Sequence, residues 1–107
     1  MKDQDVIDGK LYSIHNAERV ANHNPVSDPG DFRYLNETLY LTENGEFFIA
    51  GEGGAQTTYS TRIDSTTTAG GSGIVPKTRD EARRWCEQND ISAETILEYF
   101  EDDVEVA

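Results

Sequence analysis

The sequence predicts an α+β fold, in which a small antiparallel sheet of about three to five strands packs against two C-terminal helices. Two runs rich in aromatic and β-branched residues flank Asn44-Gly45, and this pattern predicts a central hairpin over 37–50. Two helix-start signals follow in the last third of the chain, and they predict helices over 78–88 and 92–101. Strand signals followed by helix signals are typical of this fold class.

The central hairpin is the strongest local signal in the chain. An Asn-Gly pair favours a two-residue type I′ turn, because both central residues of that turn need positive φ. In the register set by that turn, Leu41 faces Phe48, and Tyr40 faces Ile49 on the other side of the sheet. Both faces of the hairpin therefore carry apolar groups. We expect it in the interior of the sheet, covered on each side.

Three further segments carry strand signals. Residues 10–14 follow an Asp-Gly turn, and Leu11 and Tyr12 with Ile14 predict a short strand. In residues 57–63 Tyr59, Thr61 and Ile63 alternate, which predicts a third, half-buried strand of the sheet. Residues 74–75 precede Pro76, which cannot donate to a ladder, so they predict a short edge strand.

The remaining segments before the helices have weaker signals. Residues 17–21 fit either one or two helical turns or a second short strand. Residues 22–31 are dense in Asn, Pro, Asp and Gly, and this composition predicts a loop. Residues 64–73 are rich in Gly, Ser and Thr, and we expect them to form a mobile loop.

The two helices have clear N-terminal signals. Thr78 and Glu81 have the spacing of a capping box, in which each side chain accepts from the other residue's backbone amide. On the helix that follows, Trp85 and Cys86 share an apolar face. Ser92 is placed to cap the second helix.

Length and composition indicate one globular domain, 1–107, with an acidic C-terminal segment. The chain has 107 residues, 36% of them hydrophobic and 28% charged, which is apolar enough to fold. It has no apolar stretch of membrane-spanning length, and its first residues lack the pattern of a signal peptide. Cys86 is the only cysteine, so no disulfide within the chain is possible. We therefore expect a protein of the cytoplasm with no membrane association.

Negative charge is the strongest global feature. The chain has 21 Asp and Glu against 9 Lys and Arg, a formal net charge of −12. This charge opposes direct binding to nucleic acid or to an anionic membrane and attracts a basic partner. After Arg84 there are eight acidic residues and no basic residue.

The second predicted helix orders part of this charge. At about 100° per residue, Glu94, Glu98 and Glu101 fall into one stripe, with Glu105 in line if the helix extends so far. We predict that this acidic ridge binds the partner. Its residues are Glu87, Glu94, Glu98, Glu101, Asp102 and Glu105. The alternative is a solvated tail whose charge only keeps the chain in solution.

The glycine cluster at 51–54 resembles a phosphate-binding loop but lacks its requirements. Gln56 stands where a dinucleotide fingerprint needs its third glycine, and Glu52 would place a negative charge beside the phosphates. We therefore expect a strand end or bulge where only glycine supplies the backbone angles. The predicted structural turn residues are Asn44, Gly45, Gly51, Gly53 and Gly54.

No residues in the sequence carry a trustworthy catalytic or metal-binding pattern. His15, His23 and Cys86 lack metal-ligand spacing, so we expect no metal and no cofactor. Cys86 shares its helix face with Trp85 and is more simply a buried small residue than a nucleophile. The carboxylates are too many for an acid–base pair to be singled out. We expect a protein that is not an enzyme.

One resemblance to known proteins covers most of the chain. It comprises ETLYLTENGEFFIAGEGG at 37–54, GSGIVPKTRDEARRWCEQN at 71–89 and AETILEYF at 93–100. Together these resemble uncharacterised small acidic proteins of bacterial phages and integrative elements. The resemblance implies a mobile-element setting and no particular activity.

Acidity and the mobile-element setting together suggest a function. Mobile elements often encode small acidic proteins that occupy the nucleic-acid grooves of host defence nucleases, as some anti-CRISPR and anti-restriction inhibitors do. Regularly spaced carboxylates can pair with the Lys and Arg side chains that normally meet phosphates. We therefore predict a non-enzymatic, DNA-mimicking binder of a basic, nucleic-acid-binding protein. The alternative is a small structural or regulatory interaction domain whose acidity serves solubility only.

Overall fold

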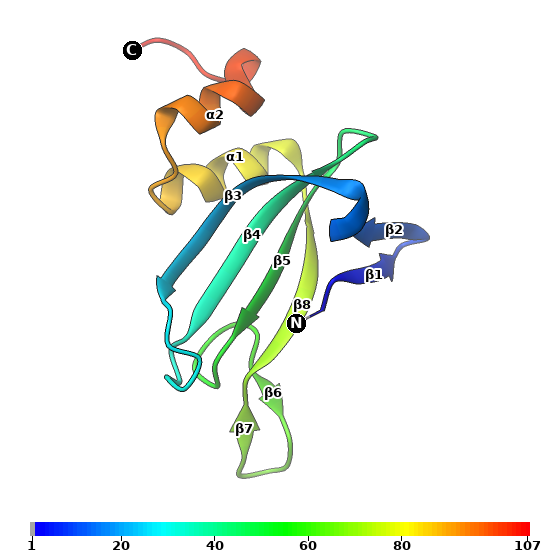
Figure 1. Cartoon of the computed structure of the whole chain (residues 1–107), viewed down its shortest axis with the longest axis vertical. Coiled ribbons are helices and arrows are strands. Elements are labelled where there is room, and N and C mark those ends of the chain that lie inside the picture. Colours follow the sequence, from blue (N-terminus) through cyan, green and yellow to red (C-terminus); the bar gives the residue numbers. More distant parts are fainter. Residues whose placement is uncertain (1) are drawn as a thin grey trace.

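The computed structural model describes residues 2–107 and has an α+β architecture, as predicted (Figure 1). Four antiparallel strands form the main sheet in the order β3-β4-β5-β8. Their bounds are β3 Ala17–Val26, β4 Leu35–Thr42, β5 Phe47–Gly53 and β8 Gly71–Lys77. Two helices and a 3-10 turn follow: α1 Arg79–Gln88, α2 Ala93–Phe100 and η2 Glu101–Asp103. Figure 1 shows α2 and the C-terminus beyond one end of the strands.

Two small hairpins stand apart from the main sheet. The first pairs β1 (Gln4–Ile7) with β2 (Lys10–Ser13) and is followed by the 3-10 turn η1 (Ile14–Asn16). The second pairs β6 (Thr61–Arg62) with β7 (Thr68–Ala69). Figure 1 shows the β6–β7 hairpin beyond the end of the sheet opposite α2.

The central hairpin exists, but its turn differs from the predicted one. The amide of Gly45 donates to the carbonyl of Thr42 at 3.0 Å, and the amide of Thr42 donates to the carbonyl of Glu46 at 2.8 Å. Of the Asn-Gly pair only Gly45 has positive φ, at 82°. These bonds describe a three-residue loop, a type I turn followed by a left-handed glycine, and not a type I′ turn. The predicted register is therefore wrong by one residue, and Leu41 faces Phe47.

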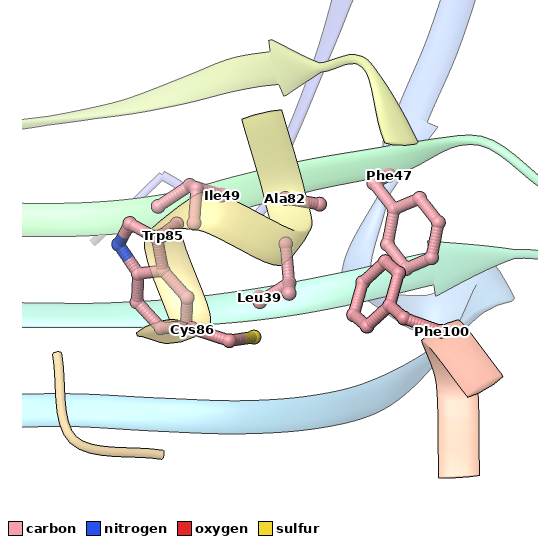
Figure 2. Packing of buried hydrophobic residues seen from close by; sticks show 7 residues of the cluster. All are labelled: Leu39, Phe47, Ile49, Ala82, Trp85, Cys86 and Phe100. Atoms are coloured by element: carbon pink, nitrogen blue, oxygen red, sulfur yellow. The ribbon is translucent and has the colours of Figure 1, made fainter. Parts of the chain in front are cut away.

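This register assigns the apolar side chains of the hairpin to two faces. On the helix side, the buried cluster consists of Leu39, Phe47, Ile49, Ala82, Trp85, Cys86 and Phe100 (Figure 2). On the opposite side, Tyr12 of the β1–β2 hairpin packs edge-on against Phe48 at 5.7 Å, and Tyr40 stacks on Phe48 at 5.3 Å. The prediction of an interior hairpin covered on both faces is confirmed.

Strand β3 replaces the predicted helical turns at 17–21 and extends into the predicted loop at 22–31. The alternative of a strand at 17–21 is therefore the correct one. The register of β3 against β4 shifts between Arg19 and Ala21, which marks a β-bulge. Because of this bulge, the adjacent residues Val20 and Ala21 both pack against the helix-side cluster. Two adjacent apolar residues facing the same side are also expected of a helix, so the sequence pattern fitted helical turns.

The predicted third strand at 57–63 does not join the main sheet. Only its last part pairs, in the β6–β7 hairpin, and Ile63 is 64% exposed. The fourth strand of the sheet is β8, which is longer than predicted and begins inside the predicted mobile loop at 64–73. It is an edge strand, as predicted, and Pro76 lies within it opposite Phe48.

Both helix starts are confirmed. The amide of Glu81 donates to the Thr78 hydroxyl at 3.1 Å, and the amide of Thr78 donates to the Glu81 carboxylate at 2.8 Å, which completes the capping box. Ser92 accepts from the amide of Thr95 at 3.3 Å. The buried face of α1 is formed by Ala82, Trp85 and Cys86. Burial raises the pKa of the Cys86 thiol to about 11, so this thiol stays protonated at neutral pH.

Candidate functional site

The predicted acidic ridge lies on exposed surface at the C-terminal end of the molecule. Glu94 and Glu98 are on α2, and Glu101 and Asp102 continue into η2. Because α2 ends at Phe100, Glu105 lies outside the helix and does not extend the stripe. The structure thus brings four of the six predicted residues together along α2 and η2.

Helix α1 differs from α2 because its charges compensate one another. Arg83 bonds Asp80 at 2.5 Å and Glu87 at 3.0 Å, and Arg84 bonds Asp80 at 2.9 Å. Glu87, a predicted member of the ridge, is therefore already paired. Surface pairs of this kind add little stability, typically about 0–1 kcal/mol each, but they cancel charge.

The carboxylates beyond α1 have almost no such compensation. Arg79 reaches across to Asp103 at 2.5 Å. Within residues 2–107, no ion pair involves the other acidic side chains of this region, which are Asp90, Glu94, Glu98, Glu101, Asp102 and Glu105. These six carboxylates are exposed to solvent.

Helix α2 is held on the rest of the protein mainly through Tyr99 and Phe100 at its end, and Ile96 packs against the same cluster. Phe100 is fully buried and stacks on Phe47 at 5.1 Å, and the guanidinium of Arg79 lies 5.3 Å from the centre of the Phe100 ring. The hydroxyl of Tyr99 donates to Glu18 on β3. This bond, together with burial, raises the pKa of Tyr99 to about 12. These contacts fix the position of α2, and therefore of its acidic residues, relative to the sheet.

A second candidate site lies on the helix side of the sheet, beyond the part that α1 covers. One row of paired residues crosses all four strands there: His23 on β3, Glu37 on β4, Gly51 on β5 and Gly73 on β8. The row thus places one carboxylate in the middle of the sheet. Glycines on the next two strands leave space above the backbone.

Tyr59 fills that space. A Cβ on Gly51 would lie 2.1 Å from the Tyr59 hydroxyl oxygen, and a Cβ on Gly73 would lie 3.9 Å from the ring. The Tyr59 hydroxyl donates to Glu37 at 2.5 Å. Burial first, and this bond second, raise the pKa of Tyr59 well above its usual value.

Trp85 approaches the same carboxylate from α1. Its Nε1–H donates to Glu37 over 3.4 Å, a long bond, and its ring meets His23 edge-on at 6.3 Å. Figure 2 shows Trp85 at the end of the helix-side cluster away from Phe100, with its nitrogen pointing out of the cluster. Trp85 is therefore both a core residue and part of the second site.

Between these side chains lies a groove of about 860 Å³. We name it the Glu37 groove. It is lined by Glu37, Tyr59, Trp85, Leu35, Ile49, Val75 and Lys77, by Gly73, and by the polar residues Gln56, Thr57, Thr58, Ser60, Thr61 and Ser72. Its volume is in the range of ligand-binding clefts, and it combines apolar walls with a few charged groups, as such clefts do.

Sequence reasoning missed this site, although two signals for it exist. Glu37 is in phase with Leu39 and Leu41 on β4, so a strand reading places a carboxylate on the buried face. Gly51 and Gly73 are paired across β5 and β8, and glycine inside a strand often marks a close approach by another group.

The glycines at 51–54 have a different role from the predicted one. Gly51 and Gly53 do not turn the chain, because they form the end of β5, and neither has positive φ. Gly53 makes room for Thr57, whose hydroxyl oxygen would lie 2.1 Å from a Cβ there, as Gly51 does for Tyr59. Gly54 follows the strand and lies against the backbone of Phe32. Glycine is needed at these positions because other groups lie where a Cβ would be, and not because the backbone angles require it.

No protein-family model, no curated protein and no solved structure matches this chain. Within residues 2–107, neither helix has the length and apolar content that crossing a bilayer requires. The same residues contain no group of three His, Cys, Asp or Glu side chains arranged to hold a metal ion.

Replacing Tyr59 by phenylalanine is expected to make the free energy of unfolding depend less on pH in alkaline solution. Because the pKa of Tyr59 is raised in the folded chain, the folded state holds this proton more tightly than the unfolded chain does. Its contribution to stability is complete below pH about 10, the ordinary tyrosine pKa, and is lost as the pH rises above that value.

Urea unfolding at pH 8 and pH 11 measures this effect. Wild type should lose stability between the two pH values, and Tyr59→Phe should lose less, while Tyr99 contributes equally to both proteins. Titration of the tyrosines at 295 nm should show one fewer late-ionising phenol in the variant. The same pH dependence in both proteins would contradict the burial of Tyr59.

Proposed function

We propose that this chain is a non-enzymatic binding protein that holds a basic protein surface with the carboxylates of α2, η2 and the C-terminal segment. We name this region the C-terminal acidic surface; it comprises Glu94, Glu98, Glu101, Asp102 and Glu105. The observation that carries the proposal is the contrast in pairing between the two helices. The arginines of α1 are all bonded to carboxylates, whereas these five carboxylates have no cation within residues 2–107.

The density of this charge supports a partner that normally binds nucleic acid. From Glu94 to Asp102 the chain advances about 12 Å at about 1.5 Å per residue. Four of the carboxylates lie in that span, so the mean rise between neighbouring charges is about 4 Å. A single DNA strand carries one phosphate in about 3.4 Å. The C-terminal acidic surface therefore offers a basic groove a charge spacing close to that of one strand.

The resemblance to phage and integrative-element proteins makes the proposal more specific. A mobile element gains from blocking the defence nucleases of its host, and those nucleases bind nucleic acid through Lys and Arg. The proposed function is therefore DNA mimicry against such a nuclease, of the anti-CRISPR or anti-restriction type. The partner is a protein, because the net charge of −12 opposes direct contact with nucleic acid.

Removing three charges from the C-terminal acidic surface tests the proposal. Wild type and Glu94→Gln/Glu98→Gln/Glu101→Gln are compared in pull-downs from host lysate at about 0.1 M and about 1 M NaCl, where the Debye length falls from about 10 Å to about 3 Å. Wild type should retain nucleic-acid-binding proteins at low salt only, and added duplex DNA should compete. The triple variant should retain at least about tenfold less, since each lost charge pair weakens binding.

A matched control separates local from global charge. Asp8→Asn/Asp28→Asn/Glu43→Gln removes the same number of charges from exposed residues elsewhere on the molecule. It should bind as wild type does. Equal loss in both triple variants, or retention that survives high salt, would contradict a specific role for the C-terminal acidic surface.

One observation favours the second candidate, a small structural or regulatory interaction domain. Val6 and Leu11 lie opposite each other on the β1–β2 hairpin and are 65% and 54% exposed. Such an apolar pair suits a contact driven by burial of surface, which is nearly insensitive to salt. Retention at high salt that is lost in Val6→Ser/Leu11→Ser would support this candidate.

A further inference from the structure

The carboxylate of Glu37 is half-buried and has no cationic partner in the part of the chain that the structure describes. Its two oxygens accept from Tyr59 at 2.5 Å and from Trp85 at 3.4 Å. Within residues 2–107, no Lys, Arg or His lies within ion-pair distance of it. A partly buried carboxylate with neutral donors alone is poorly compensated, because taking it from water costs free energy that a cation would recover.

The side chains around Glu37 suit a flat cation. Tyr59 and Trp85 both line the Glu37 groove, one from the loop after β5 and one from α1. Cations bind favourably over aromatic rings, and the guanidinium of arginine stacks on rings better than the more strongly hydrated ammonium of lysine. An ionised carboxylate has about four acceptor positions, of which two are used here, so it can still accept two bonds from a guanidinium.

We propose that the Glu37 groove receives an arginine side chain of a partner protein, with its guanidinium at the Glu37 carboxylate between Tyr59 and Trp85. The identity of the partner as a basic protein rests on the proposed function, whereas the site itself does not involve α2. The arginine site would be a second contact with the partner, in addition to the C-terminal acidic surface. It would recognise one particular arginine, whereas the acidic surface recognises basic charge in general.

The rest of the groove agrees with such an occupant. Leu35, Ile49 and Val75 line it with apolar surface on which the methylene stem of arginine can lie. Lys77 also lines the groove, but it is four residues along β8 from Gly73, about 13 Å away at about 3.3 Å per residue. The anionic end of the groove is therefore at Glu37, and the backbone of the partner would extend toward Lys77.

The single tryptophan of the chain reports directly on this site. The one tryptophan gives a single indole N–H resonance in a proton–nitrogen correlation spectrum. Because this N–H donates to Glu37, the resonance is sensitive to changes at the carboxylate. The probe is N-acetyl-arginine methylamide, and the control is N-acetyl-citrulline methylamide, which has a similar shape and no charge. The arginine probe should shift the indole resonance with a Kd on the order of 1 mM, as expected of a ligand of this size. The citrulline control should bind at least about tenfold more weakly.

Two variants assign the effect to Glu37. Glu37→Gln keeps the shape of the side chain and loses its charge, so it should bind the arginine probe at least about tenfold more weakly. Glu52→Gln is the matched control, because Glu52 is also half-buried on β5 and accepts from Tyr34 at 2.7 Å, but does not line the groove. It should bind as wild type does.

The triple variant of the C-terminal acidic surface separates the two proposals. It should bind the arginine probe normally, even where it loses the basic protein partner. If the arginine and citrulline probes shifted the indole resonance of the wild-type protein equally, the arginine site would be overturned. This comparison uses the wild-type protein alone, so it does not depend on whether a variant folds. Wild-type affinity in a folded Glu37→Gln protein would also overturn the arginine site. Neither result would affect the pull-down test.

Discussion

Replacing Phe100 by alanine is expected to destabilise the protein by about 3–5 kcal/mol, the usual cost of truncating a buried aromatic side chain. Phe100 is the one buried residue of α2, and its ring contacts both Phe47 and the guanidinium of Arg79. The substitution removes both contacts and leaves a cavity between α2 and the sheet. Since domains of this size are stable by about 5–15 kcal/mol, the loss is a large fraction of the total.

Urea unfolding and thermal melting measure this loss. A loss of 3–5 kcal/mol should lower the Tm by more than about 10 °C in a domain of this length. Leu97→Ala is the matched control on the same helix, because Leu97 is 45% exposed and its truncation should cost less than about 1 kcal/mol. Similar losses in the two variants would contradict the role of Phe100 as the anchor of α2.

Replacing Gly51 by alanine is expected to cost about 1–3 kcal/mol, the usual penalty of adding a methyl group to a packed site. The new Cβ would lie 2.1 Å from the Tyr59 hydroxyl oxygen, so Tyr59 has to leave its position over β5. Its bond to Glu37 is lost at the same time. The Trp85 indole resonance should move as well, because Trp85 shares that carboxylate.

Gly73→Ala is a sharp control for this prediction. Gly73 is next to Gly51 in the same row and lies under the same ring, but its Cβ would have 3.9 Å to the nearest Tyr59 atom. Neither glycine has positive φ, so alanine can adopt both backbone conformations. Because alanine also reduces the freedom of the unfolded chain, Gly73→Ala should be neutral or stabilising by up to about 1 kcal/mol. Equal destabilisation at both positions would contradict the placement of Tyr59.

The elements that sequence predicted well are those with local causes. The capping box of Thr78 and Glu81 and the cap at Ser92 depend on residues three positions apart, and both are present. The hairpin was predicted but its register was not. Asn-Gly fits a type I′ turn and also a type I turn with a left-handed glycine, and only the bonds made by Thr42 separate these.

A type I′ turn does occur in the chain, at Asp8-Gly9. Both residues have positive φ, 52° and 78°, and Ile7 pairs directly with Lys10. Two pairs with similar local preferences thus form different turns. The flanking strands decide between them, because the register of the β4–β5 hairpin must bring Leu39 and Phe47 to one face.

The misassigned segments are those whose structure depends on distant residues. The bulge in β3 turns both Val20 and Ala21 toward the helix-side cluster, most of whose residues lie on β4, β5, α1 and α2. Residues 57–63 alternate like a strand, but Tyr59 lies on glycines of two other strands and bonds Glu37. No window of sequence around these residues contains that information.

The two candidate sites differ in the same way. The C-terminal acidic surface could be predicted because it follows from a run of charges on one helix, although the pairing of Glu87 with Arg83 required the structure. The Glu37 groove leaves only partial signals in the sequence, because it joins residues of four strands, one loop and α1. Its row from His23 to Gly73 becomes visible only once the strand order is known.

The prolines of the sheet have a consequence for self-association. Each edge strand of the main sheet contains one, Pro25 in β3 and Pro76 in β8, and β3 is also irregular between His23 and Val26. Proline cannot donate a backbone hydrogen bond, and bulges twist an edge away from a flat neighbour. These edges therefore resist the growth of the sheet into aggregates. They also disfavour the pairing of a partner's strand with the edge of this sheet, so we expect partners to be recognised through side chains.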